Sequence, residues 1–182
     1  DHWGQLNSSF TVCSNGLLQS PINIPKDAKN SPHLLTLDYG SVPLVLTEET
    51  QMVLNDGHGL RVDFPKNQRL ERINFAGQTY SLIQLHIHTP GENQLNGERF
   101  PAEIHFVHQG IHGNLAVIGV FIKEGAENPV LEKILEHLPA KPNQQVVIQG
   151  ESINPLDLMP ANKNYYSFDG SLTTPPCAEG VQ

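Results

Sequence analysis

Hydrophobic and polar residues alternate over several short stretches of the chain, which predicts β-strands because alternate side chains of a strand point to opposite faces. The alternating stretches are residues 60–64, 82–88, 102–108 and 146–149. Leu115–Ile122 is hydrophobic almost throughout and predicts a more fully buried strand. Glycine and proline recur at short intervals between these stretches, as turns between short strands require. The predicted fold is therefore mainly β.

One segment near residue 130 has the spacing of a helix instead. Asn128 can accept hydrogen bonds at its start, Pro129 suits the first turn, and Pro139 would end it. The hydrophobic positions in between fall on one side of a helix and are Val130, Leu131, Ile134, Leu135 and Leu138. We therefore expect one clear amphipathic helix among the strands.

Length and charge narrow the class of protein. A chain of 182 residues fits one domain, and we expect residues 1–182 to form it. The formal net charge of −8 argues against nucleic acid or an anionic membrane as the main partner and favours small molecules. No hydrophobic run approaches the roughly 18 residues that a membrane-spanning helix needs, so no membrane span is expected.

The two cysteines, Cys13 and Cys177, lie near opposite ends of the chain. The spacing leaves two alternatives equally open, namely a disulfide that joins the terminal regions and two unrelated buried thiols. A disulfide would indicate an oxidising compartment.

Histidines carry the strongest chemical signal. In the segment 82–88, a strand's period of two places Leu82, Gln84, His86 and His88 on one face and Ile83, Leu85 and Ile87 on the other. In the segment 102–108 the same period places Glu103, His105 and Val107 on one face and Ile104, Phe106 and His108 on the other. If these strands are neighbours, the imidazoles of His86, His88 and His105 converge.

Three neutral nitrogen ligands with a fourth position open to water are typical of a catalytic zinc site, whereas structural zinc sites close all four positions, usually with cysteine. Neither strand contains cysteine. Metal-bound histidines donate their second ring N–H to an acceptor, and Gln84 and Glu103 each precede a histidine by two residues on the same face. We therefore predict Zn²⁺ held by His86, His88 and His105.

A His-x-His pair on a strand is by itself more often a surface pair or two satisfied core residues than a metal site. The nearby Glu103-x-His105 strand favours the metal. A structural or solvated role is expected for most of the other histidines, which are His2, His33, His108, His112 and His137. His58 is the exception because of the resemblance described next.

Six stretches of the sequence resemble the α-class carbonic anhydrases in the same order along the chain. They are QSPINI (19–24), NDGH (55–58), QLHIH (84–88), EIHFVH (103–108), LAVIG (115–119) and GSLTTPP (170–176). The resemblance runs from Trp3 to the last residue. It implies an α+β domain with a large central, mostly antiparallel twisted sheet and a few short peripheral helices.

The short insert between His88 and Glu103 and the cysteine pair resemble the bacterial, exported branch of this family. That resemblance implies a disulfide between Cys13 and Cys177 and a periplasmic or secreted location. The oligomeric state is left open, with a homodimer among the alternatives. The family domain also starts earlier and continues beyond Gln182, so we expect a domain that is incomplete at the C-terminus and a weaker zinc site.

The resemblance further implies a zinc lyase, a carbonate dehydratase, in which zinc hydroxide reversibly hydrates carbon dioxide to bicarbonate and a proton. His86, His88 and His105 match the zinc ligands. Thr173 matches the residue that orients the hydroxide, and Glu92 matches the carboxylate that accepts a hydrogen bond from it. Thr174 matches the residue that contacts bicarbonate or inhibitors, and His58 matches the proton shuttle. The hydrophobic wall where carbon dioxide rests is matched by Val107, Val117 and Leu172.

These residue types suit the chemistry. Carbon dioxide has no charge to hold, so a small dry hydrophobic patch is a sufficient site, and an exposed imidazole with a pKa near roughly 6.5 can pass a proton to solvent. Without the family, His58 would be read as a turn residue and the wall as ordinary core. Arg61 stands where better-known members carry an uncharged amide, which leaves shuttling by His58 open.

Two alternatives belong to other classes. The spacing His86-x-His88-x-x-x-Glu92 also resembles the first cupin motif, in which the carboxylate itself binds iron or manganese. That interpretation explains neither Glu103-x-His105 nor the Thr-Thr-Pro-Pro stretch. A non-catalytic carbonic anhydrase-like domain that binds a partner is the other alternative, and the presence of all three histidines argues against it.

Overall fold

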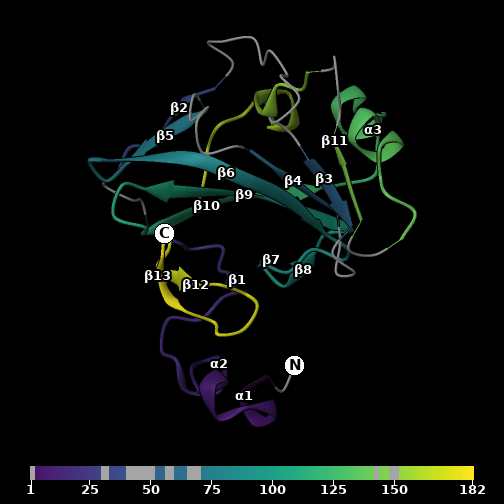
Figure 1. Ribbon diagram of the computed structural model, residues 1–182. Helices are drawn as coiled ribbons and strands as arrows, with labels where there is room; N and C mark the ends of the chain where they lie inside the picture. The colour runs from purple at the N-terminus through teal and green to yellow at the C-terminus, as the bar shows by residue number, and fades with distance from the viewer. Residues whose placement is uncertain are drawn as a thin grey trace.

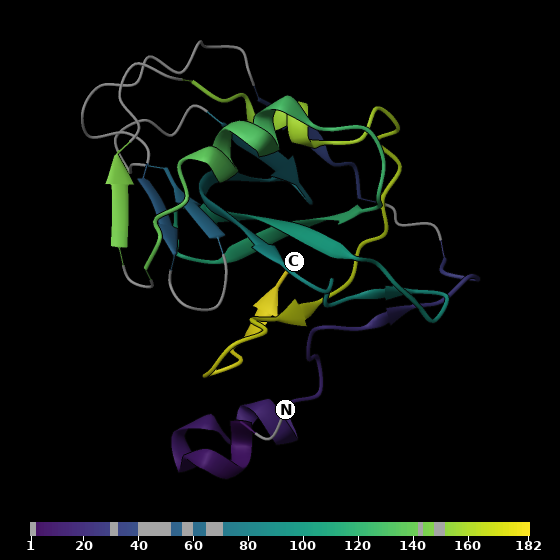
Figure 2. The same ribbon diagram turned by 90° about the vertical axis from the view of Figure 1, so that its right-hand side faces the viewer.

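The computed structural model describes residues 3–29, 33–39, 52–55, 60–64, 71–141, 144–147 and 152–182. Its main feature is a curled sheet whose long strands cross the middle of the molecule (Figure 1). A helix lies on one side of this sheet, whereas the C-terminal hairpin and the first helices lie on the other (Figures 1 and 2).

Strands dominate the described residues. In chain order they are β1 (Asn23–Ile24), β2 (Thr36–Asp38), β3 (Met52–Asn55), β4 (Leu60–Asp63), β5 (Arg72–Phe75), β6 (Gln78–His88), β7 (Gln94–Leu95), β8 (Glu98–Arg99), β9 (Ala102–Gly110), β10 (Leu115–Ile122), β11 (Gln144–Val147), β12 (Gly170–Ser171) and β13 (Glu179–Val181). The helices are α1 (Trp3–Leu6), η1 (Ser8–Phe10), α2 (Val12–Asn15), α3 (Pro129–Glu136) and η2 (Pro155–Leu158).

Among the described residues, eight strands share one antiparallel sheet. Its order is β10-β9-β6-β4-β3-β11, with β5 on β6 and β2 on β5. Two smaller sheets join β1 to β7 and β8, and β12 to β13. The predicted fold class is confirmed, and so is the pairing of the two histidine strands, because His86 lies opposite His105. The predicted strand 146–149 corresponds to β11, and its residues 148–149 lie outside the described residues.

One predicted side-chain direction is wrong. Leu82 of β6 pairs with His108 but Gln84 pairs with Val107, so the strand carries a β-bulge at this point. The extra residue reverses the alternation, and Leu82 is buried in the same hydrophobic core as Leu85. From Gln84 onward the predicted alternation holds, which keeps Gln84, His86 and His88 together.

The prediction that Leu115–Ile122 is a more fully buried strand is also wrong. In β10 Ala116 is buried, Gly119 is exposed, and the other residues are half-buried. The reason is position, because β10 ends the strand order of the sheet. On the side away from β9, Val117 N donates to Gln182 O and Gln182 N donates to Leu115 O, at 2.7 and 3.1 Å.

The predicted helix is α3. The Asn128 side chain accepts from the backbone N–H groups of Val130 and Leu131, both at 3.0 Å, as expected of an N-cap. Ile134 is fully buried, whereas Leu135 and Leu138 are exposed, so the predicted hydrophobic stripe is narrower than expected. The helix ends at Glu136, which removes Leu138 from its helical face.

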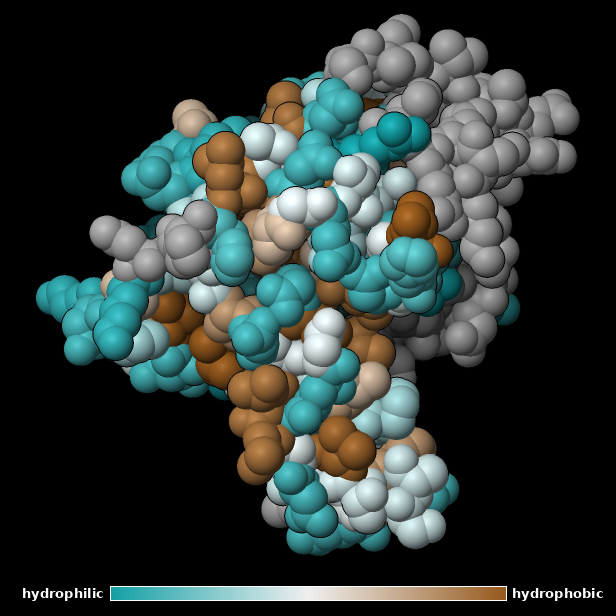
Figure 3. Space-filling view, turned by 90° about the vertical axis from the view of Figure 1, so that its left-hand side faces the viewer, coloured by the Kyte–Doolittle hydropathy of each residue, from teal (hydrophilic) through white to brown (hydrophobic). Residues whose placement is uncertain are grey.

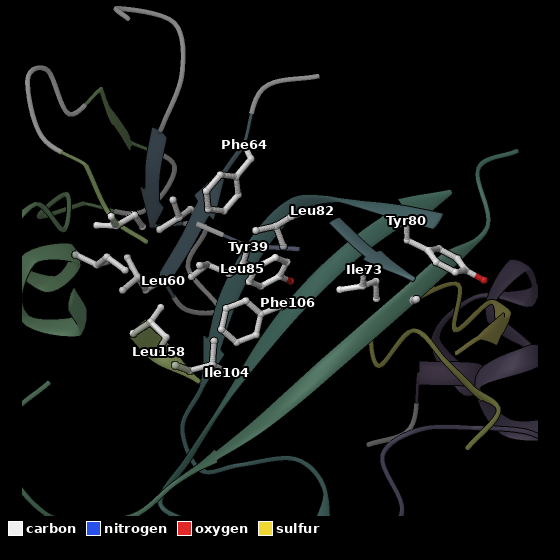
Figure 4. Packing of buried hydrophobic residues seen from close by; sticks show 14 of the residues in the cluster. Tyr39, Leu60, Phe64, Ile73, Tyr80, Leu82, Leu85, Ile104, Phe106 and Leu158 are labelled. Carbon is white, nitrogen blue, oxygen red and sulfur yellow. The ribbon is translucent and has the colours of Figure 1, made fainter. Parts of the chain in front are cut away.

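The hydrophobic core lies between the sheet and the α3 side of the molecule. Side chains from several strands meet there, as Figure 4 shows for Leu60, Leu82, Leu85, Ile104, Phe106 and Leu158. Tyr39 and His108 are buried with them, and the Tyr39 hydroxyl hydrogen-bonds to His108 Nε2. Since Ala116 O can only accept, His108 Nδ1 donates to it at 3.2 Å and Nε2 accepts from Tyr39.

A disulfide ties the N-terminal helices to the C-terminal hairpin, as the resemblance implies. Cys13 of α2 is bonded to Cys177, which lies between β12 and β13. Two hydrogen bonds join the same two regions. Leu18 N donates to Glu179 Oε1 at 2.7 Å, and Gln19 Nε2 donates to Cys177 O at 3.2 Å.

Some large hydrophobic side chains stay on the surface. On the face in Figure 3 they lie among hydrophilic side chains and gather toward the lower half. Leu17, which follows the first helices, is 92% exposed. No helix among the described residues is long and hydrophobic enough to cross a membrane.

Candidate metal centre

Three histidines from neighbouring strands meet on the side of the sheet opposite the hydrophobic core. One ligand atom from each of His86, His88 and His105 lies within 4.8 Å of the others. The ring centroids are 4.7 Å apart for His86 and His88, 5.1 Å for His86 and His105, and 4.7 Å for His88 and His105. The structure therefore brings together the predicted triad.

Acceptors behind two of the rings decide which nitrogen can bind a metal. The amide oxygen of Gln84 lies 2.8 Å from His86 Nδ1, so Nδ1 carries the proton and Nε2 keeps its lone pair. Glu103 Oε1 lies 3.0 Å from His105 Nε2, so Nε2 carries the proton and Nδ1 keeps its lone pair. Both acceptors are the residues that strand periodicity predicts.

Glu103 is almost fully buried and accepts from four donors. His105 Nε2 and Asn93 Nδ2 reach Oε1, and the backbone N–H groups of Glu92 and Asn93 reach Oε2, the last three at 2.8 Å. Burial alone would raise the pKa of Glu103, but the hydrogen bonds from His105 and Asn93 outweigh it and lower the pKa to about 2. Glu103 is therefore an anion that faces the His105 ring.

Sequence reasoning missed Asn93. Its Nδ2 donates to Glu103, and its Oδ1 accepts from Ile22 N at 2.9 Å, so this amide connects the segment before β1 with the carboxylate behind His105. Asn93 is ten residues from Glu103 in the sequence, across two short strands, and no periodicity relates them. The sequence signal that could have indicated its role is its position directly after Glu92, which was itself a predicted site residue.

Gly119 leaves room for the Glu103 carboxylate. A Cβ at this position of β10 would lie 2.8 Å from Glu103 Oε1, which is closer than real Cβ contacts. Because four hydrogen bonds fix that carboxylate, it cannot move away without losing donors.

Glu92 lies beside the histidines rather than behind them. Its Oε2 is 3.4 Å from His88 Nε2 and 3.9 Å from His105 Nδ1. Apart from these approaches, this buried oxygen has no hydrogen-bond partner among the described residues. A buried carboxylate oxygen directed at ligand nitrogens fits a site that holds a cation.

A cavity of about 1200 Å³ opens over the histidines. Its lining includes most of the remaining predicted site residues, namely Thr173, Thr174, Leu172, Val107 and Val117. Thr173 follows β12, so the C-terminal hairpin places it on the side of the sheet that carries the histidines (Figure 1). His58 lies outside the described residues.

The donor set fits zinc. Three imidazoles supply the neutral nitrogen ligands that Zn²⁺ prefers, and acceptors for the second nitrogens of His86 and His105 are in place. Both cysteines are joined in the disulfide, so they are not available to close the coordination shell.

Comparisons with known proteins agree with this geometry. Residues 1–182 match the family model of eukaryotic-type carbonic anhydrase. A carbonic anhydrase of Pectobacterium carotovorum is 38% identical over 187 residues, which cover 100% of this chain and 70% of that protein. One of Neisseria gonorrhoeae is 35% identical over 181 residues, which cover 100% of this chain and 68% of that protein.

Solved structures give the same result. The α-carbonic anhydrase from Thermovibrio ammonificans, in complex with the inhibitor sulfanilamide, has a TM-score of 0.86 and 37% identity, over 99% of this chain and 76% of that one. Sequence similarity along this whole chain, the sheet and the histidine triad thus lead to one conclusion: this chain belongs to the α-class, or eukaryotic-type, carbonic anhydrase family.

Proposed function

We propose that this protein reversibly hydrates carbon dioxide to bicarbonate and a proton, with Zn²⁺ held by His86, His88 and His105. Membership of the family makes it a carbonate dehydratase, a lyase. The observation that carries the metal assignment is the convergence of the three imidazoles within 4.8 Å.

The chemistry that zinc supplies in such a site is a water whose pKa falls to about 7, which makes a nucleophile available at neutral pH. The chain's own residues prepare this site. Gln84 and Glu103 hold the rings of His86 and His105 in one tautomer, so each directs a lone pair inward. Two of the three rings are thus oriented before a metal binds.

Thr173 and Glu92 are proposed to orient the nucleophile. Both border the cavity, and Glu92 Oε2, which has no hydrogen-bond partner among the described residues, can accept a hydrogen bond from the Thr173 hydroxyl. A threonine that donates to Glu92 has only lone pairs left for the nucleophile, which turns the nucleophile's own lone pair toward carbon. We assign contacts with bicarbonate to Thr174, which is exposed and lines the cavity.

Carbon dioxide is proposed to rest on Val107, Val117 and Leu172. Val107 is 6% exposed, and the other two are half-buried in the same cavity. A hydrophobic wall excludes water but offers no charge, so binding of this uncharged substrate should be weak. His58 remains the proposed proton shuttle on the strength of the resemblance alone.

A cupin-type site is not favoured, and one variant separates the two interpretations. Glu92→Ala would remove a metal ligand from a cupin site, whereas in the proposed site it removes only the acceptor for Thr173. We expect Glu92→Ala to keep stoichiometric zinc and to lose most of the hydration rate. Loss of the metal in this variant would instead support the cupin alternative.

Metal removal tests the activity itself. Chelation should abolish hydration of carbon dioxide in a stopped-flow assay, and added zinc should restore it, whereas a non-catalytic binding domain would show stoichiometric zinc without hydration. We also propose a periplasmic or secreted location, supported by the Cys13–Cys177 disulfide. A homodimer stays a prediction, which sedimentation velocity can measure.

A further inference from the structure

We propose that Arg61 forms an anion-binding subsite at the mouth of the cavity, where it holds bicarbonate as it enters or leaves. The inference rests on the proposed function, because it concerns the charged partner of that reaction. Arg61 is the residue on β4 opposite His86 on β6. Directly opposed residues of antiparallel strands project from the same face, with Cβ atoms about 4.5–5.5 Å apart.

Asp63 fixes the Arg61 guanidinium from one side. Arg61 Nε lies 3.0 Å from Asp63 Oδ1, and Nη2 donates to Oδ2 at 3.0 Å. Of the five N–H groups of the guanidinium, only one on Nη2 donates a hydrogen bond to Asp63, because Nε approaches Oδ1 without hydrogen-bond geometry. Arg61 borders the cavity, whereas Asp63 is not among the residues that line it.

Charge makes this position distinctive. Among the described residues that border the cavity, the cationic side chains are Arg61 and Lys163, and the carboxylates are Glu92 and Glu103. Lys163 Nζ donates to Pro160 O in an exposed segment after η2, whereas Arg61 lies in the strand beside a metal-binding histidine. The protein as a whole carries a net charge of −8, which repels bicarbonate at long range.

A planar guanidinium suits a planar oxyanion because two parallel N–H groups can meet two oxygens. The Arg61 side chain is 34% exposed, so its attraction is partly screened by solvent and should be modest. Arg61 is therefore a weak local site for bicarbonate in an otherwise repulsive field.

The test measures bicarbonate as a product inhibitor of carbon dioxide hydration. In Arg61→Gln we expect the inhibition constant of bicarbonate to rise about 3- to 10-fold, as expected for the loss of one charged contact at a partly exposed site. Arg99→Gln is the matched control, since it removes the same charge from exposed β8 outside the cavity. Its inhibition constant should stay within about twofold of the unmodified protein.

The equilibrium constant of the reaction supplies an internal check on the rate constants measured for each variant. No variant can change the ratio of kcat/KM for hydration to kcat/KM for dehydration. An unchanged inhibition constant in Arg61→Gln, or an equal rise in Arg99→Gln, would overturn the inference. If neither the unmodified protein nor the variants hydrate carbon dioxide, the proposed function fails instead.

Salt dependence keeps the inference testable if Arg61→Gln does not fold. Screening weakens a local attraction and raises the inhibition constant of the unmodified protein, whereas screening of the overall negative charge would lower it. A rise with ionic strength is expected, and a fall would contradict the subsite.

Discussion

Glu103 organises the candidate site at the scale of single residues. It combines almost complete burial with four donors, and its ionised form fixes the tautomer of His105. Strand periodicity predicts Glu103 and Gln84 because both lie two residues before a histidine. Asn93 and Gly119 were not predicted as parts of the site, since their contacts with Glu103 depend on how distant segments pack.

Asn93→Ala should weaken zinc binding about 10- to 100-fold, the usual range for loss of an outer partner of a metal ligand. The variant removes a donor to Glu103 and the acceptor for Ile22 N. Competition with a chromogenic chelator measures the affinity. Asn74→Ala is a control on β5, where Asn74 accepts from Thr79. Equal zinc affinity in Asn93→Ala and the unmodified protein would contradict this role.

Gly119→Ala should also weaken zinc binding, by about tenfold or more, because the new Cβ displaces Glu103 from behind His105. Gly125→Ala makes the same chemical change where no heavy atom lies within 4 Å of the new Cβ. The same chelator competition compares the two. The prediction fails if the two alanine variants bind zinc equally well.

His108 should make the stability of the protein depend on pH. Burial lowers the pKa of His108 from 6.5 to about 4, with opposing hydrogen bonds to the backbone. Well above pH 6.5 the ring is neutral in both the folded and the unfolded protein. As the pH falls from 6.5 toward 4, only the unfolded chain takes up the proton, so up to about 3 kcal/mol of stability is lost.

Urea unfolding between pH 4 and 7 measures this effect. His108→Asn should be less stable at pH 7 but lose less stability on acidification, because its side chain does not titrate. The difference between the two proteins separates His108 from Glu71, whose pKa is raised by burial and which acts in the opposite direction. Parallel pH profiles for the two proteins would rule out this role.

At the scale of elements, the periodicity of the sequence predicts where strands form better than it predicts how deeply their residues are buried. The sequence predicts β9 and β10 at almost their observed bounds. It does not predict the bulge in β6, because the adjacent hydrophobic residues Leu82 and Ile83 fit either phase of the alternation. Nor does it show that β10 ends the strand order, since a hydrophobic run is common to central and terminal strands of a sheet.

Among the features at this scale, the disulfide is expected to contribute most to the free energy of unfolding. Replacing Cys13 and Cys177 together by serine should lower the free energy of unfolding by about 2–5 kcal/mol, because the bond restricts the unfolded chain. Urea titrations of the two proteins measure the difference. A reductant should lower the midpoint of the unmodified protein and leave the double variant unchanged. Equal midpoints for both proteins without reductant would contradict a stabilising bond.

At the scale of the whole molecule, the sheet brings the pieces of the site together from distant parts of the chain. The histidines come from β6 and β9, the threonines follow β12, and the disulfide anchors that hairpin to α2. Periodicity alone predicts that the three histidines converge, which the structure shows. The reaction was predicted from the family resemblance, because Thr173, Glu92 and the hydrophobic wall are ordinary residue types without it.

The most direct test of the central claim measures zinc content and carbon dioxide hydration on the same preparation of the protein, beside His105→Ala and the exposed-histidine control His112→Ala. We predict stoichiometric zinc and hydration above the buffer rate in the unmodified protein and in His112→Ala, with both lost in His105→Ala. Stoichiometric zinc with hydration no faster than buffer would contradict the account.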